Sequence, residues 1–233
     1  MFLKDIDFKE FNLKKNISLK KKLNKILSKK NSVIDSLAKN YINSYDKKLL
    51  NKYKKFLNFR VIGMGGSILG TQAIYDFLGY KIKKKFQFIN NLDSSLKNKT
   101  KEKYVNLIVS KSGNTIETIA NVNLFVKKTD HNIFITENKK SYLFLLANKL
   151  KSEIIHHNNF IGGRYSVLSE VGMLPAELMG LNANNFKNYN NLIKNKFFLN
   201  KLISNVCSTL YLIKKKKFNS IIINYDEKSK NLF

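Results

Sequence analysis

The chain has 233 residues, 43% of them hydrophobic, so it can bury a substantial core and has room for one full domain and part of another. Its formal net charge of +27 would suit a nucleic-acid partner, but the lysines are spread along the chain and arginine, the usual reader of bases, occurs only twice. No apolar run reaches the about 20 residues needed to span a bilayer, and the charged N-terminus is unlike a secretory signal. The composition therefore favours a soluble cytoplasmic protein that binds neither nucleic acid nor membrane.

Residues 1–57 are predicted to form a helical N-terminal segment. Apolar residues recur at helical spacing at Leu19, Leu23 and Ile26. The sequence SVID, residues 32–35, can begin a second helix with a serine cap and an acidic first turn.

Residues 58–183 alternate short apolar runs with helical segments. The expected strands are 59–64, 85–90, 105–110, 131–136 and 153–158, and the expected helices are 67–79, 94–102, 114–128 and 141–150. Several strands are apolar on both faces, and the stretches between them are long enough for crossover helices. We therefore expect an α/β fold: a three-layer α/β/α sandwich with a parallel sheet of about five strands.

Residues 184–233 are predicted to be helical to about 217 and to form one more strand over 220–224. Cys207 lies in apolar helical sequence, which indicates a buried structural thiol, and one cysteine offers no Cys-based metal site. A lone parallel strand cannot bury its faces or complete its ladder of hydrogen bonds. We therefore expect a helical connector followed by the first strand of an incomplete second α/β domain.

The turn after the first expected strand is GMGGSILGT, residues 63–71. Gly65 and Gly66 would let the backbone approach an anion, and the helix beginning near Ser67 would present free N–H groups to it. Ile68 replaces the third glycine of the dinucleotide fingerprint, and Thr71 replaces the lysine of the P-loop. The alternative is a tight turn in which Ser67 only caps the helix.

The turn after the third expected strand, SKSGNTIET at 110–118, combines three hydroxyls, an ammonium and a glycine backbone. The residues are Ser110, Lys111, Ser112, Gly113 and Thr115. This set suits a compact dianionic phosphate and lacks the metal ligands of an Mg²⁺–nucleotide site. Simple capping of the next helix is the alternative.

A third motif, GGRYSVLSEVGMLPAE, occupies residues 162–177. Gly163 permits close backbone approach, and Arg164 offers a planar fork of donors that lysine cannot imitate. The pair indicates a place where an oxyanion is held. Pro175, the only proline, is expected to start or kink a helix after this loop.

In this order, the three motifs resemble the phosphoglucose isomerase family, whose members are built from two sugar-isomerase (SIS) domains. The resemblance covers residues 58–182 most strongly, and the third motif is close to a signature of the family. It implies an SIS-type fold and the interconversion of glucose 6-phosphate and fructose 6-phosphate through a cis-enediolate, without metal or other cofactor. Members are typically dimeric, so a homodimer is implied for the full-length protein.

The resemblance also implies residue roles. Ser67 would lie at the substrate, and Arg164 would lie over the reacting carbons and stabilise the enediolate, because a guanidinium stays charged. The residues that would grip the sugar phosphate are Ser110, Lys111, Ser112 and Thr115. The family's catalytic base and ring-opening histidine are expected beyond residue 233, so the chain is expected to be inactive alone.

Two functional alternatives stay open: a free-standing sugar-phosphate-binding SIS module that senses or regulates, and a bifunctional phosphoglucose/phosphomannose isomerase. Glu170 stands where the family more often has a small residue or proline, so it puts an acid near the site. Its role stays open. His156 and His157 are interpreted as strand-end residues, and Glu117 as an acid on a helix face.

Overall fold

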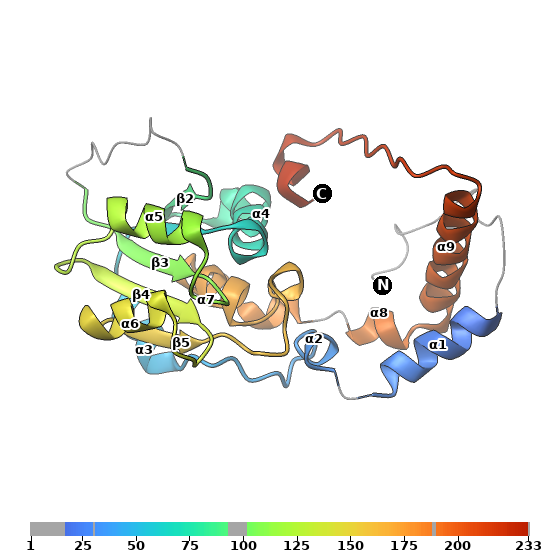
Figure 1. Cartoon of the computed structure of the whole chain (residues 1–233), viewed down its shortest axis with the longest axis horizontal. Coiled ribbons are helices and arrows are strands. Elements are labelled where there is room, and N and C mark those ends of the chain that lie inside the picture. The colour runs from blue at the N-terminus through green and yellow to red at the C-terminus, as the bar shows by residue number, and fades with distance from the viewer. Residues whose placement is uncertain (1–16, 30, 93–101, 188–189, 233) are drawn as a thin grey trace. The chain divides into compact units, whose positions relative to one another are not determined.

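The structure, a computed structural model, describes residues 17–29, 31–92, 102–187 and 190–232 (Figure 1). These residues fall into two compact units. One comprises residues 42–185 and 224–232 and contains the sheet, and the other comprises the described residues up to Tyr41 together with 186–223.

The sheet has five parallel strands in the order β2-β1-β3-β4-β5. The strands are β1 (Asn58–Gly63), β2 (Lys85–Ile89), β3 (Val105–Val109), β4 (His131–Thr136) and β5 (Glu153–His156). Each begins within one residue of the start predicted from the sequence. The predicted five-stranded parallel sheet is confirmed.

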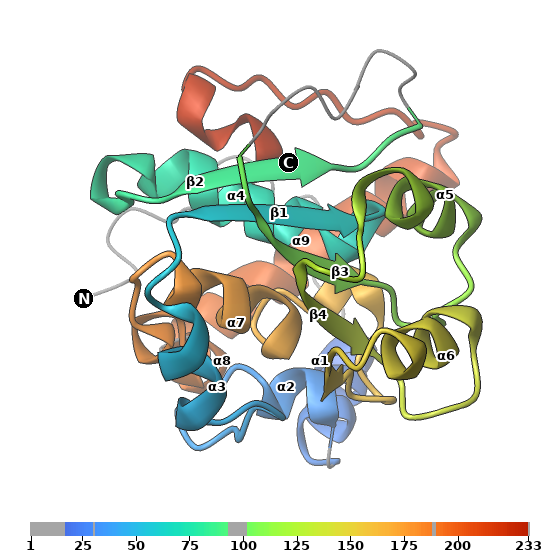
Figure 2. The same cartoon turned by 90° about the vertical axis from the view of Figure 1, so that its left-hand side faces the viewer.

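Helices cover both faces of the sheet (Figure 2), as a right-handed crossover rule requires when strand order reverses. The helices α5 (Ile116–Phe125) and α6 (Tyr142–Lys149) lie on one face. The helices α3 (Lys47–Tyr53), α4 (Leu69–Leu78) and α7 (Glu170–Leu178) lie on the other. The helix predicted over 94–102 falls almost wholly outside the described residues.

The core continues on both sides of the strands because successive side chains alternate between faces. Under α5 and α6, one buried cluster joins strand and helix residues: Ile62, Ile89, Ile108, Val122, Phe125, Phe134, Leu143 and Ala147. Val61 and Leu107, the alternate residues of β1 and β3, are also fully buried. The expectation of strands that are apolar on both faces is therefore met.

A row of polar side chains crosses the middle of the sheet, in register on four strands: Gln87, Arg60, Asn106 and Asn132. Arg60 is only 4% exposed, and its Nε donates to Gln87 Oε1 at 2.9 Å. Its guanidinium also lies 4.4 Å from the centre of the Tyr104 ring. Burial lowers the pKa of Arg60 from its usual value, although the side chain remains well supplied with partners.

The second unit is helical, with α1 (Ile17–Leu27), α2 (Ser32–Asp35), α8 (Asn190–Lys194) and α9 (Lys196–Lys214). Cys207 on α9 is buried, as predicted. The predicted cap of α2 was wrong by one residue. Asn31 is the cap, because its side-chain oxygen accepts from the Val33 N–H at 2.9 Å.

Two further expectations differ from the structure. Residues 220–224 form no regular secondary structure, and Ile221 is 87% exposed. None of the five described strands pairs with this segment, so its ladder of hydrogen bonds is not formed. For Pro175 the expected helix start is wrong, since α7 begins at Glu170 and contains Pro175 in its interior, while the expected kink stays a prediction.

Candidate functional site

The order of the strands places the site. β1 pairs with β2 on one side and β3 on the other, so the chain leaves β1 and β3 in opposite directions. In an open parallel sheet, ligands bind at the carboxyl ends of the strands at such a switch point. The first two sequence motifs follow β1 and β3, so they meet at this point.

The glycine loop after β1 does not use Ser67 as a helix cap. Gly65–Ser67 form a short 3-10 turn, and α4 begins only at Leu69. The residue at the cap position is Ile68, and no side-chain hydrogen bond caps α4. Gly65 has a left-handed φ of 55°, which favours glycine. The half-buried Ser67 hydroxyl is thus not committed to capping.

Gly66 makes a close backbone contact with the third motif. A Cβ added to Gly66 would lie 2.3 Å from the carbonyl carbon and oxygen of Gly163. The Ser166 hydroxyl reinforces the contact by donating to the Gly163 carbonyl at 2.7 Å, with a longer contact of 3.4 Å to the Gly66 carbonyl. In the structure Gly66 approaches the backbone of Gly163. The approach to an anion expected from the sequence stays a prediction.

The loop after β3 brings two hydroxyls together. Ser110 is buried, and its Oγ lies 3.0 Å from Thr115 Oγ1. Thr115 occupies the cap position of α5, yet its side chain makes no capping hydrogen bond. Gly113 has a φ of 67° and packs against Ser141, where a Cβ would clash at 2.1 Å from the Ser141 Oγ. The capping alternative therefore does not account for Thr115.

The remaining residues of this loop are more exposed. Ser112 is exposed, and its Oγ accepts from the Asn114 N–H at 3.3 Å. Glu117 lies in the first turn of α5.

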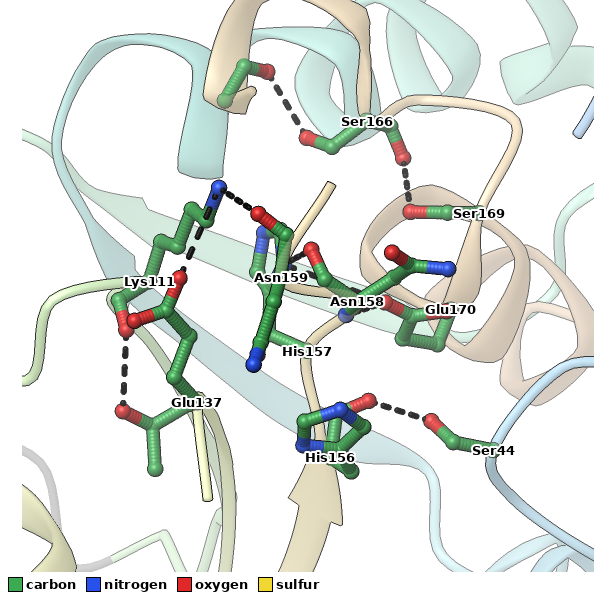
Figure 3. Close-up of polar contacts among 12 residues, drawn as sticks. Ser44, Lys111, Glu137, His156, His157, Asn158, Asn159, Ser166, Ser169 and Glu170 are labelled. Carbon is green, nitrogen blue, oxygen red and sulfur yellow. Dashed lines mark hydrogen bonds and ion pairs between the residues drawn. The ribbon is translucent and has the colours of Figure 1, made fainter. Parts of the chain in front are cut away.

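Lys111 extends from this loop toward the segment that follows β5 (Figure 3). Its Nζ donates to the Asn159 carbonyl at 2.7 Å and lies 3.5 Å from Glu137 Oε1. Glu137 also pairs with Lys139 at 2.9 Å. Burial tends to raise the pKa of Glu137, but Lys139 and Lys111 outweigh it and hold that pKa below its ordinary value. The Lys111 ammonium is thus fixed between two loops.

His157, the first residue of the same segment, and Glu170 are both buried (Figure 3). Glu170 Oε1 accepts from the Asn158 N–H at 2.7 Å and lies 3.9 Å from His157 Nδ1. His157 Nδ1 is also 3.1 Å from the Asn158 carbonyl, and its Nε2 has no hydrogen-bond partner among the described residues. Burial lowers the pKa of His157, which keeps the ring neutral at neutral pH.

The neighbouring His156 is exposed and has structural contacts, in keeping with its interpretation as a strand-end residue. Its Nδ1 accepts from the Asn138 N–H at 3.2 Å, and its carbonyl accepts from the Ser44 hydroxyl.

Arg164 is exposed on the turn Gly163–Tyr165 and makes no hydrogen bond or ion pair to the part of the chain that the structure describes. Its guanidinium is therefore available to a ligand.

Within the part of the chain that the structure describes, no group of three or more His, Cys, Asp or Glu is placed to hold a metal ion. None of the described helices has both the length and the apolar character needed to cross a membrane.

The fold and the three loops define an α/β protein with a candidate anion site at the switch point of a parallel sheet. A family model, phosphoglucose isomerase, matches residues 16–227. The chain belongs to the phosphoglucose isomerase family.

Two curated relatives show the extent of the similarity. The chain is 34% identical over 195 residues to the glucose-6-phosphate isomerase of Methanocaldococcus jannaschii, covering 74% of this chain and 47% of the relative. It is 35% identical over 153 residues to that of Carboxydothermus hydrogenoformans, covering 55% of this chain and 33% of the relative. The matches thus span between a third and about half of the relatives' length.

Among solved structures, a hypothetical protein of Thermus thermophilus has a TM-score of 0.61 and 20% sequence identity. The match covers 84% of this chain and 52% of that one. At this identity the likeness concerns the fold alone.

Proposed function

We propose that the chain is part of a glucose-6-phosphate isomerase, which interconverts glucose 6-phosphate and fructose 6-phosphate through a cis-enediolate. Family membership and the names of the relatives support this reaction. In this proposal the enzyme is cytoplasmic and homodimeric and uses no cofactor.

The facing hydroxyls of Ser110 and Thr115 carry the proposal. They lie where β3 meets α5, beside the free N–H groups of a helix start. The hydroxyls of Ser67 and Ser112 and the Lys111 ammonium complete the set that holds the substrate phosphate. A phosphate dianion accepts strong charge-assisted hydrogen bonds from such donors.

Arg164 supplies the second function of the site. Its exposed guanidinium belongs to a loop that packs backbone to backbone on the glycine loop. A cation held there stabilises the negative charge that develops on the enediolate oxygens. Because arginine stays protonated, it does not compete for the proton that moves between the two carbons.

The general base completes the proposal. Residues 58–183 are the first of two SIS domains, and residues 184–233 lead into the second. This chain covers 33% and 47% of the two relatives described. In this proposal the base lies in the part of the enzyme that this chain does not cover.

A double substitution tests the phosphate site. Ser110→Ala with Thr115→Ala removes two hydrogen bonds to a charged group, each worth about 1.5–3 kcal/mol, so affinity for fructose 6-phosphate should fall at least about tenfold. Calorimetry measures the affinity. Thr129→Ala is the control, because Thr129 lies in the loop before β4, at the opposite edge of the sheet, and should leave the affinity unchanged. Equal affinity of the double variant and the wild type would refute this site.

A kinetic test addresses Arg164. In any form of the protein that turns over fructose 6-phosphate, Arg164→Lys should lower kcat more than it raises KM, because the guanidinium acts on charge that develops only in the transition state. A change confined to KM would reassign Arg164 to anchoring the substrate.

A further inference from the structure

Glu170 carries a carboxyl group that is almost completely buried, and burying such a group costs free energy unless it has polar partners. Its side chain is 1% exposed, at the first residue of α7. The start of a helix favours negative charge, which makes this position tolerable for a carboxylate. Its Oε1 accepts from the Asn158 N–H at 2.7 Å, so one contact of Glu170 reaches across to the segment after β5.

That contact anchors a tight turn. The Asn158 side-chain oxygen accepts from the Phe160 N–H at 2.9 Å, and the Asn158 carbonyl accepts from the Ile161 N–H at 3.2 Å. Asn158 thus organises both sides of the turn. A constraint on its N–H therefore constrains the whole turn 158–161, which leads directly into Gly162.

The same turn holds Lys111. The carbonyl of Asn159 accepts from the Lys111 Nζ at 2.7 Å, and Glu137 lies on the other side of the ammonium at 3.5 Å. Lysine has a flexible four-carbon stem whose ordering costs conformational entropy. Restraining the side chain before a ligand arrives reduces the entropy cost of ordering it on binding.

We propose that Glu170 is a positioning residue for Lys111. Its carboxylate fixes the turn 158–161, and the Asn159 carbonyl of that turn holds the Lys111 ammonium next to the loop after β3 that carries Ser110 and Thr115. This inference rests on the proposed function in one respect: it takes a sugar phosphate as the ligand of Lys111. The positioning itself is a property of the free protein (Figure 3).

The first experiment needs no ligand. An amine-reactive ester is applied to the purified chain, and the modification of Lys111 is followed by mass spectrometry relative to Lys85, a more exposed lysine at the start of β2. Glu170→Ala should raise the relative rate at Lys111 about fivefold, which corresponds to about 1 kcal/mol, the usual net contribution of one hydrogen bond. Glu177→Ala is the matched control, because it removes another carboxylate of α7 that bonds to Tyr45 instead. It should leave the Lys111 rate unchanged.

Two conservative variants separate hydrogen-bond geometry from charge and remain usable if Glu170→Ala fails to fold. Glu170→Gln keeps an oxygen at the right reach for the Asn158 N–H, so Lys111 should react at the wild-type rate. Glu170→Asp keeps the charge but is one methylene shorter, so Lys111 should react as fast as in the alanine variant. The reverse pattern would overturn the proposal, since charge and not the held turn would then control Lys111.

The second experiment is a double-mutant cycle on fructose 6-phosphate affinity with Glu170→Ala and Lys111→Met. Glu170→Ala should weaken binding about fivefold in the wild type and less than about twofold when Lys111 is already absent. The aspartate variant replaces the alanine variant in the cycle if only the former folds.

The outcomes distinguish this proposal from the proposed function. An equal loss of affinity in both backgrounds, or unchanged Lys111 labelling in a folded alanine or aspartate variant, would overturn the positioning role. If the wild type binds no sugar phosphate while the labelling pattern appears as expected, the proposed function fails and the positioning of Lys111 stands.

Discussion

Replacing Gly66 by alanine should push two loops of the site apart. The added Cβ would lie 2.3 Å from both the carbonyl carbon and the carbonyl oxygen of Gly163, and 2.7 Å from the Arg164 nitrogen. All three atoms belong to the backbone, so no side-chain rotation can relieve the contact. The loop that contains Gly66 and the loop that contains Gly163 and Arg164 (the arginine loop) must therefore move relative to each other.

The size of the effect follows from these distances. Carbon atoms pack at about 3.5–4 Å, so the two loops must separate by about 1 Å or more. Overpacking of this kind typically costs about 1–3 kcal/mol. A loss of about 2 kcal/mol would lower the Tm by about 4–8 °C for a domain of this size.

Gly163→Ala is the matched control from the same contact. The contact is asymmetric, because a Cβ on Gly163 would meet its nearest atom, the Gly66 Cα, at 3.9 Å, an ordinary van der Waals distance. Both variants lose the same backbone freedom in the unfolded chain, so comparing them isolates the clash. Thermal and urea unfolding give the stabilities, and calorimetry gives the affinity for fructose 6-phosphate.

Gly66→Ala should be less stable than Gly163→Ala by about 2 kcal/mol and should bind the sugar phosphate more weakly. Equal stability of the two variants would refute the reasoning, because it would show that the loops do not pack as closely as the structure has them.

His157→Gln should flatten the dependence of stability on pH. Burial holds the pKa of His157 below 6.5, so below that pH the unfolded chain takes up a proton that the folded chain refuses, and wild-type stability should fall by up to about 1.4 kcal/mol per pH unit. Urea unfolding at pH 7.5 and 5.5 measures both slopes, and an unchanged slope in the variant would count against the buried neutral histidine. Arg60→Lys should destabilise the fold by about 2–4 kcal/mol, because lysine loses the fork that reaches Gln87 and the Phe125 carbonyl while its charge stays buried. The same exchange at the exposed Arg164 should change stability by less than about 0.5 kcal/mol, and similar effects at the two sites would contradict the structural role of Arg60.

The strands were predictable because their signal is local. Continuous apolar runs bounded by polar segments mark buried parallel strands, and all five begin within one residue of their predicted starts. Residues 220–224 carry the same signal, but a strand also needs a neighbour, which a local pattern cannot supply. Sequence pattern therefore reports what a segment can form, while pairing decides what it does form.

The loops of the candidate site could be picked out for a similar reason, since glycines and hydroxyls at strand ends are visible in the sequence. The roles predicted for their residues stay predictions. The contacts that organise these loops were missed. The Gly66 contact with Gly163 and the Lys111 bond to Asn159 involve backbone atoms of residues distant in the chain, and any residue type can supply a carbonyl. Glu170 gave the one usable signal, an acid where the family more often has a small residue or proline.

The burial of Arg60 gives the chain an unusual chemical selectivity. The sequence has two arginines, and Arg60 lies inside the sheet at 4% exposure whereas Arg164 is exposed. An arginine-selective dicarbonyl reagent applied to the folded protein therefore meets one accessible guanidinium, and each modified molecule carries its mark at the same position. A single mass shift then reports the occupancy of the arginine loop directly, and protection by a sugar phosphate can be titrated on the native chain without any substitution.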